Sequence, residues 1–145
     1  MLKSFALLLV VMSAVFIADQ AIKNVFVEGF RYYTDYIDLI LVFNKGVAFS
    51  MFAFLAESLK WLQLALLAGV LAYTLWLKEK RYLIPVGIMV GAGLSNVADR
   101  FIYGGVVDYV YWHYGFSFAV FNFADVMIDI AVIWLFILNY TVKKA

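Results

Sequence analysis

The chain has 145 residues, of which 67% are hydrophobic and 14% are charged, with a formal net charge of +1. Ordinary soluble domains are about 45–50% apolar, so much of this surface must face lipid, and the low charge gives no reason to expect a nucleic-acid partner. Cysteine is absent and His113 is the only histidine, which excludes disulfides, thiol nucleophiles and Cys/His zinc sites.

Four stretches are long and apolar enough to cross a bilayer, whose core of about 30 Å needs roughly 20 apolar residues in a helix. They cover approximately residues 4–23, 61–77, 82–98 and 122–142. The only proline, Pro85, falls in the first turn of the third stretch, where a helix tolerates it. A cleaved signal peptide is the alternative for the first stretch. Because Phe16 interrupts any small-x-small cleavage site before Asp19, we expect this stretch to remain as a span.

Two segments between the spans are typical of β-strands. Residues 36–43 and 106–112 are rich in β-branched and aromatic side chains, and the second follows Gly104-Gly105. We expect a small sheet from about residues 25–50 and 104–112. The nearby aromatic residues suit a membrane interface and are Tyr109, Tyr111, Trp112, Tyr114, Phe116 and Phe118. The predicted fold is a single domain over 1–145, an all-α membrane protein with four transmembrane helices and a small β-sheet.

Basic residues predict the orientation of the chain in the membrane. The turn of residues 78–81 has three basic residues and one acidic residue, and Lys3, Lys143 and Lys144 lie near the termini. Residues 24–59 contain more acidic than basic side chains. The positive-inside rule therefore places both termini in the cytoplasm and the sheet outside.

The few polar residues near the membrane form five groups, and the predicted topology brings all of them to the outer face. The groups are Asp19-Gln20-Ala21-Ile22-Lys23, Asn44-Lys45-Gly46-Val47-Ala48-Phe49, Asn96-Val97-Ala98-Asp99-Arg100, Val106-Val107-Asp108-Tyr109 and Phe121-Asn122-Phe123-Ala124-Asp125. Chance would distribute such groups over both faces.

Each group also has a purely structural interpretation. Asp19 and Lys23 are spaced to form a surface ion pair, although an acid near a helix C-terminus opposes the helix dipole. Asn44 and Gly46 could form a turn, and Asn96 could make a helix–helix hydrogen bond. Asp99 and Arg100 could be charges at the membrane interface, with Arg100 binding lipid phosphate. Asn122 could cap the fourth helix, where the helix dipole favours an acid such as Asp125.

Asp108 and Asp125 are the strongest candidates for chemistry. Asp108 interrupts an apolar strand, and Asp125 lies in the first turn of the fourth span. Ionisable groups at membrane depth are costly and usually functional. Two neighbouring carboxylates cannot both ionise cheaply, so one can activate water while the other supplies a proton. This chemistry needs neither a metal nor a cofactor.

In order and spacing, the five groups resemble the motifs of bacterial lipoprotein signal peptidase, also called signal peptidase II, and the resemblance extends from Asp19 to Asp125. It implies that Asp108 and Asp125 are the catalytic pair of an aspartyl endopeptidase. The residues implied to bind substrate or support the site are Asp19, Lys23, Asn44, Gly46, Asn96, Asp99, Arg100, Asn122 and Ala124.

The resemblance also implies the substrate and the location. The substrate would be a prolipoprotein whose cysteine carries a diacylglyceryl group, cut just before that cysteine at the outer face of the bacterial inner membrane. The sheet would be a β-cradle that holds the extended peptide. We expect a monomer in contact with membrane lipid, no nucleic-acid partner, and inhibition by globomycin-type cyclic peptides.

Two features depart from the family pattern. Ala119 stands where the family often has proline, and Asp129 is an additional acid one helical turn after Asp125. Asp129 could perturb the pair or form a helix–helix hydrogen bond.

Three other functions are open. An ion or proton carrier could use Asp125 with Asp129, although repeats and broken helices are missing from the sequence. A Ser/Lys peptidase could combine Ser50 or Ser95 with Lys23 or Lys45. The third possibility is a non-catalytic lipid-binding or assembly subunit.

Overall fold

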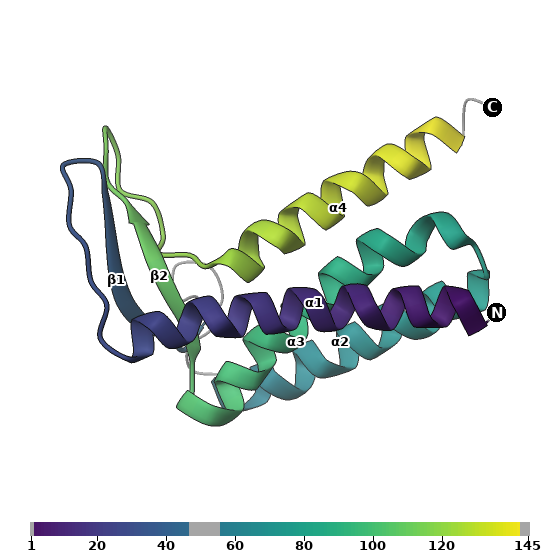
Figure 1. Ribbon diagram of the computed structural model, residues 1–145, viewed down its shortest axis with the longest axis horizontal. Helices are drawn as coiled ribbons and strands as arrows, with labels where there is room; N and C mark the ends of the chain where they lie inside the picture. The colour runs from purple at the N-terminus through teal and green to yellow at the C-terminus, as the bar shows by residue number, and fades with distance from the viewer. Residues whose placement is uncertain (1, 47–55, 143–145) are drawn as a thin grey trace.

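The computed structural model describes residues 2–46 and 56–142. The elements in chain order are α1 (Leu2–Val27), β1 (Ile37–Asn44), α2 (Ala56–Leu77), the 3₁₀ turn η3 (Lys80–Tyr82), α3 (Leu83–Tyr103), β2 (Val106–Trp112) and α4 (Phe123–Val142). The four long helices are apolar and long enough to cross a membrane, which confirms the predicted architecture. The two-stranded sheet lies at one end of the helices, and the turn between α2 and α3 lies at the other with the first turn of α1 (Figure 1).

Three helix ends differ from the prediction by four or five residues. α1 continues to Val27 instead of ending at 23, α2 begins at Ala56 instead of 61, and α3 continues to Tyr103 instead of ending at 98. The predicted spans stopped at charged residues, because an unpaired charge is costly in lipid. In the structure Lys23 and Asp99 are buried and paired with one another, so both helices continue through them.

The third helix is the centre of the bundle. In its most apolar window 72% of the residues are buried, against 11% in each of the other three. Small residues in α3 permit its central position, because they let the neighbouring helix approach closely. A Cβ atom added at Gly91 would lie 2.4 Å from the carbonyl oxygen of Met12 on α1, and one at Gly87 would lie 3.0 Å from Val11 Cγ1. Small residues four apart are a common way for membrane helices to approach closely.

This packing predicts a difference between two glycine substitutions. Gly91→Ala should lower stability by about 1–3 kcal/mol, because the methyl group meets backbone and forces α1 away from α3. Gly69→Ala is the matched control on α2, where Gly69 is exposed and an added Cβ meets no atom of residues 2–46 or 56–142 within 4 Å. Thermal unfolding in detergent, followed by tryptophan fluorescence, should show a lower midpoint for Gly91→Ala alone. Equal midpoints would contradict this account of the bundle.

The sheet is antiparallel and brings two sequence groups together. Val42 pairs with Asp108 and Asn44 pairs with Val106, with a shift in register between Leu39 and Val42. The segment before α4 joins the same strand, because the N–H groups of Tyr109 and Val110 both donate to the carbonyl oxygen of Phe121. The first turn of α4 is therefore held beside the middle of β2.

Tyr109 corrects one of the predictions for the interfacial aromatic residues. Its side chain is buried and stacks on Phe26 of α1 with the ring centroids 4.2 Å apart. The hydroxyl accepts a hydrogen bond from the backbone N–H of Phe123 at 2.9 Å. Tyr109 thus satisfies one of the free N–H groups at the start of α4 instead of facing the bilayer interface.

Candidate active site

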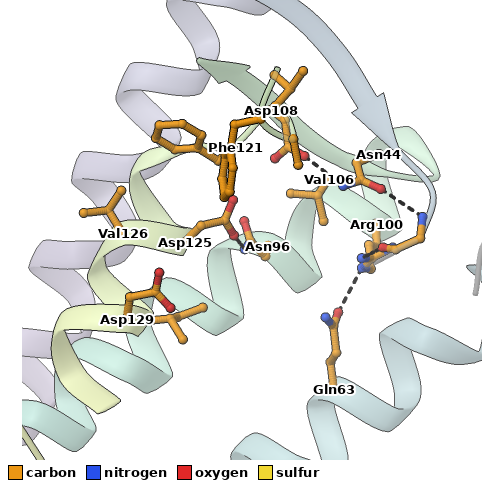
Figure 2. Close-up of a pocket in the computed structure, with 15 residues that line it drawn as sticks. Asn44, Gln63, Asn96, Arg100, Val106, Asp108, Phe121, Asp125, Val126 and Asp129 are labelled. Carbon is orange, nitrogen blue, oxygen red and sulfur yellow. Dashed lines mark hydrogen bonds between the residues drawn. The ribbon is translucent and has the colours of Figure 1, made fainter. Parts of the chain in front are cut away.

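A pocket of about 510 Å³ opens where β1, β2 and the helices meet. Six of the eleven residues predicted to be catalytic or to support the site line it, namely Asn44, Gly46, Asn96, Arg100, Asp108 and Asp125. Figure 2 labels all of them except Gly46. The other five do not reach its surface. Asp19, Lys23, Asp99, Asn122 and Ala124 are buried behind it.

Asp108 is held by two asparagine side chains from distant parts of the chain. Asn122 Nδ2 donates to Asp108 Oδ1 at 2.7 Å, and Asn44 Nδ2 donates to Asp108 Oδ2 at 3.0 Å. The backbone N–H of Gly46 donates to Asn44 Oδ1 at 3.0 Å. Because an N–H can only donate, this turn fixes the amide of Asn44 with its NH₂ group toward Asp108. The turn predicted at Asn44 is present, and it also orients a site residue.

Asp125 and Asn122 form a reciprocal cap at the start of α4. The backbone N–H of Asp125 donates to Asn122 Oδ1 at 2.9 Å, and the backbone N–H of Asn122 donates to Asp125 Oδ2 at 3.1 Å. This is the geometry of a capping box. Asn96 Nδ2 donates to the other oxygen, Asp125 Oδ1, at 3.0 Å. The capping predicted for this motif is therefore present, and it fixes Asp125 at the wall of the pocket.

A buried lysine determines how the asparagine of α3 is oriented. Lys23 Nζ lies 2.6 Å from Asp19 Oδ2 and 2.6 Å from Asp99 Oδ2, and it donates to Asn96 Oδ1 at 2.7 Å. An ammonium group has three donors and no acceptor, so all three are used. Asn96 must therefore present its oxygen to Lys23 and its NH₂ group to Asp125. The alternative of an ion pair on the surface does not describe these side chains, which are at most 1% exposed.

The two carboxylates of this cluster also fix the backbone beside each candidate catalytic residue. Asp19 Oδ1 accepts from the N–H of Ala124 at 2.9 Å, and Asp99 Oδ2 accepts from the N–H of Val107 at 3.1 Å. Ala124 directly precedes Asp125, and Val107 directly precedes Asp108. Side chains from α1 and α3 thus position the strand and the helix that supply the acid pair.

Burial changes the acidity of Asp108. The residue is 2% exposed, and desolvation, together with the smaller effect of the charge of Asp125, raises its pKa from the usual 3.8 to about 7. Hydrogen bonds from Asn44 and Asn122, and the charge of Lys23, oppose this rise in pKa. An acid pair of this kind can hold one proton near neutral pH.

Arg100 connects three segments around the pocket. Its Nε donates to Gln63 Oε1 of α2 at 2.9 Å, its Nη1 donates to the carbonyl oxygen of Lys45 at 3.3 Å, and its Nη2 donates to that of Gly46. Gln63 was not singled out from the sequence. The available signal was its amide within the uncharged run of α2, since polar side chains there need a partner.

The structure also bears on the Ser/Lys alternative. Ser95 Oγ donates to Asp19 Oδ2 at 2.6 Å, and Gln20 Nε2 donates to Ser95 Oγ at 2.9 Å, so this hydroxyl is engaged within the buried cluster. Neither Ser95 nor Lys23 lines the pocket. Val47, Ala48, Phe49 and Ser50, which were part of a predicted motif or of this alternative, lie outside the described residues.

The fold and the pocket define an integral membrane protein with a polar site at one end of its helices. The family model for signal peptidase (SPase) II matches residues 11–141, and the chain belongs to that family, which makes it a peptidase. The lipoprotein signal peptidase of Sulfurimonas denitrificans is 60% identical over 141 residues, covering 97% of this chain and 92% of the relative. That of a Sulfurovum species is 54% identical, covering 96% of each chain. That of Helicobacter pylori is 53% identical over 98% of this chain and 92% of the relative.

Two solved structures share the fold. A bacterial membrane enzyme determined by the in meso method at 2.3 Å aligns with a TM-score of 0.79 over 92% of this chain and 87% of that chain, at 20% identity. A second bacterial membrane enzyme, determined by the same method at 1.9 Å, aligns with a TM-score of 0.75 over 90% of each chain, also at 20% identity. At this identity the likeness concerns the fold.

Proposed function

We propose that this chain is an aspartyl endopeptidase that removes signal peptides from diacylglyceryl-modified prolipoproteins, cutting just before the lipidated cysteine. Family membership and the names of the relatives support the substrate class. The observation that carries the aspartyl mechanism is the position of Asp108 and Asp125 on one pocket, each held by asparagine side chains.

The chemistry needs one ionised and one protonated carboxyl group. The ionised aspartate takes a proton from a water molecule, whose oxygen attacks the scissile carbonyl carbon. The protonated aspartate donates to the carbonyl oxygen as it gains charge. Collapse of the tetrahedral species breaks the C–N bond, and the leaving amine receives a proton from the pair. No covalent intermediate forms. Asn44, Asn96 and Asn122 keep both carboxyl groups oriented throughout.

Substrate delivery follows from the depth of the site. The acyl chains remain in lipid, where each buried methylene contributes roughly 0.8 kcal/mol to anchoring. Confinement to the membrane also raises the effective concentration of substrate at the enzyme. We propose that Arg100, which lines the pocket, donates hydrogen bonds to the backbone carbonyl groups of the extended substrate peptide. Because backbone groups are recognised, the enzyme should select only weakly among the side chains that precede the cysteine in the substrate.

The test is cleavage of a purified precursor in liposomes. Wild-type protein and a diacylglyceryl-modified precursor should yield a product that begins at the modified cysteine, identified by mass spectrometry. The same precursor without the lipid, at equal membrane density, should be cut very slowly. No product from the lipidated precursor would exclude the proposed function. Equal rates for both would assign the chain to general intramembrane peptidases.

The pH dependence of cleavage provides a second test. Because the pKa of Asp108 is raised to about 7, the pair retains its proton up to near neutral pH, and kcat/KM should fall as the pH rises through about 7. The hydrogen bond from Asn44 lowers this pKa. Asn44→Leu removes that hydrogen bond, so the decline should move to higher pH. A pH–rate profile of the variant that is unchanged or shifted to lower pH would contradict this assignment.

The proposal includes the topology and the partners. Both termini face the cytoplasm, and the pocket faces outward from the bacterial inner membrane. The single domain works as a monomer, without metal or cofactor, and binds globomycin-type cyclic peptides at the pocket. The carrier alternative is less well supported, because Asp108 and Asp125 share the pocket with Asn44 and Arg100, and these residues belong to the two strands and to the helix ends next to them.

A further inference from the structure

The pocket contains a third acid that the proposed reaction does not use. Asp129 lines the pocket on α4 together with Asp125, because residues four apart lie on one face of a helix. Its side chain is exposed, and within residues 2–46 and 56–142 it makes no hydrogen bond or ion pair. An ionisable side chain within a membrane span is costly and is a functional candidate by default. Its position on the pocket indicates that a ligand satisfies it.

The walls of the pocket differ in hydrogen-bonding character. Arg100 and Gln63 lie on one side, Asp129 and Val126 lie on the other, and Asp125 with Asn96 lies between them (Figure 2). Arg100 has five N–H donors and no acceptor, whereas a carboxyl group offers acceptor oxygens in either protonation state. In an extended peptide, each residue directs its N–H and its carbonyl group to the same edge, and successive residues alternate between the two edges, so both edges offer donors and acceptors. A strand that lies between these walls can therefore offer a carbonyl group of one residue to Arg100 and the N–H group of an adjacent residue to α4.

The position of Asp129 along α4 determines which segment of the substrate its side chain can contact. It lies four residues after Asp125 along α4, which is about 6 Å farther from the sheet at 1.5 Å per residue. In the proposed topology this direction leads into the bilayer. The signal helix of the substrate lies on that side of the scissile bond. Where that helix unwinds for cleavage, its N–H groups lose their partners, and an unsatisfied group in lipid costs several kcal/mol.

We propose that Asp129 is a positioning residue that accepts a hydrogen bond from a backbone N–H of the substrate on the signal-helix side of the scissile bond. This inference rests on the proposed function and extends it. Asp129 takes no part in the chemistry. It holds the unwound peptide in register, so that the bond before the cysteine lies between Asp108 and Asp125.

Two variants of the same shape separate this role from packing. Asp129→Leu keeps the branching and removes the acceptor, whereas Asp129→Asn keeps one acceptor oxygen. For the lipidated precursor, Asp129→Leu should lower kcat/KM by roughly 10-fold, as expected for one unmade hydrogen bond. Asp129→Asn should retain the larger part of the wild-type kcat/KM. Ile130→Val, on the exposed neighbour, is the control for general changes on α4.

The decisive experiment removes the substrate N–H instead. Precursors are made with one backbone amide replaced by an ester at each of the three positions before the cleavage site. One ester should lower wild-type kcat/KM by roughly 10-fold and have little further effect in Asp129→Leu, because the same hydrogen bond is then already missing. Equal activity of Asp129→Leu and wild type, or ester effects that are the same in both proteins, would overturn the inference. Failure of wild type to cut the unmodified precursor would instead refute the proposed function.

Discussion

Asp108→Asn and Asp125→Asn should each abolish cleavage, lowering the rate by about 100- to 10,000-fold or more, because one carboxyl group cannot be both base and acid. Asparagine keeps an oxygen able to accept the hydrogen bonds that Asn122 and Asn96 donate to these two residues. The double variant should be little worse than either single variant, since residues that act as a unit are not additive. The measurement is single-turnover cleavage of the lipidated precursor in liposomes, with membrane insertion checked by flotation of the liposomes.

The control for lost charge is Asp35→Asn. Asp35 is exposed and lies in the loop before β1, outside the pocket, so its substitution should leave cleavage unchanged. Substantial turnover by correctly inserted Asp108→Asn or Asp125→Asn protein would refute the aspartyl mechanism. Two large losses that add in the double variant would indicate two independent roles for these residues.

The sequence was sufficient to predict most of the fold, because the features that define it are local. The apolar runs have the length of a bilayer and predict four spans, which the structure confirms. The β-branched run of 106–112 matches the observed β2, and the run of 36–43 matches β1 to within one residue at each end. The convergence of six predicted residues on one pocket follows from the topology.

The partners of the buried side chains could not be predicted, since they join residues far apart in the chain. The spacing of Asp19 and Lys23 suggests only a local pair, whereas Lys23 also binds Asp99 and Asn96 of α3. This neutralisation is also why α1 and α3 extend past their predicted ends. Gln63 was missed because an isolated amide in an apolar helix does not reveal its partner.

The buried cluster predicts the largest loss of stability. Lys23→Met keeps the length of the side chain and leaves Asp19 and Asp99 buried without their cation. Breaking a buried ion pair on one side costs about 3–5 kcal/mol. The variant should also lose cleavage activity, because the two carboxylates hold the N–H groups of Ala124 and Val107 beside the acid pair.

The matched control is Lys60→Met, which removes the lysine from the ion pair with Glu57. The side chain of Glu57 is 85% exposed, so this substitution should change stability by at most about 1 kcal/mol. A second comparison tests whether unpaired charge is the cause. Combining Lys23→Met with Asp19→Asn and Asp99→Asn removes all three charges, so the triple variant should melt at a higher temperature than Lys23→Met alone. Its activity should stay low, because an amide oxygen is a weaker acceptor for those backbone N–H groups than a carboxylate. If Lys23→Met and Lys60→Met melted alike in detergent, the cluster would not hold the site together.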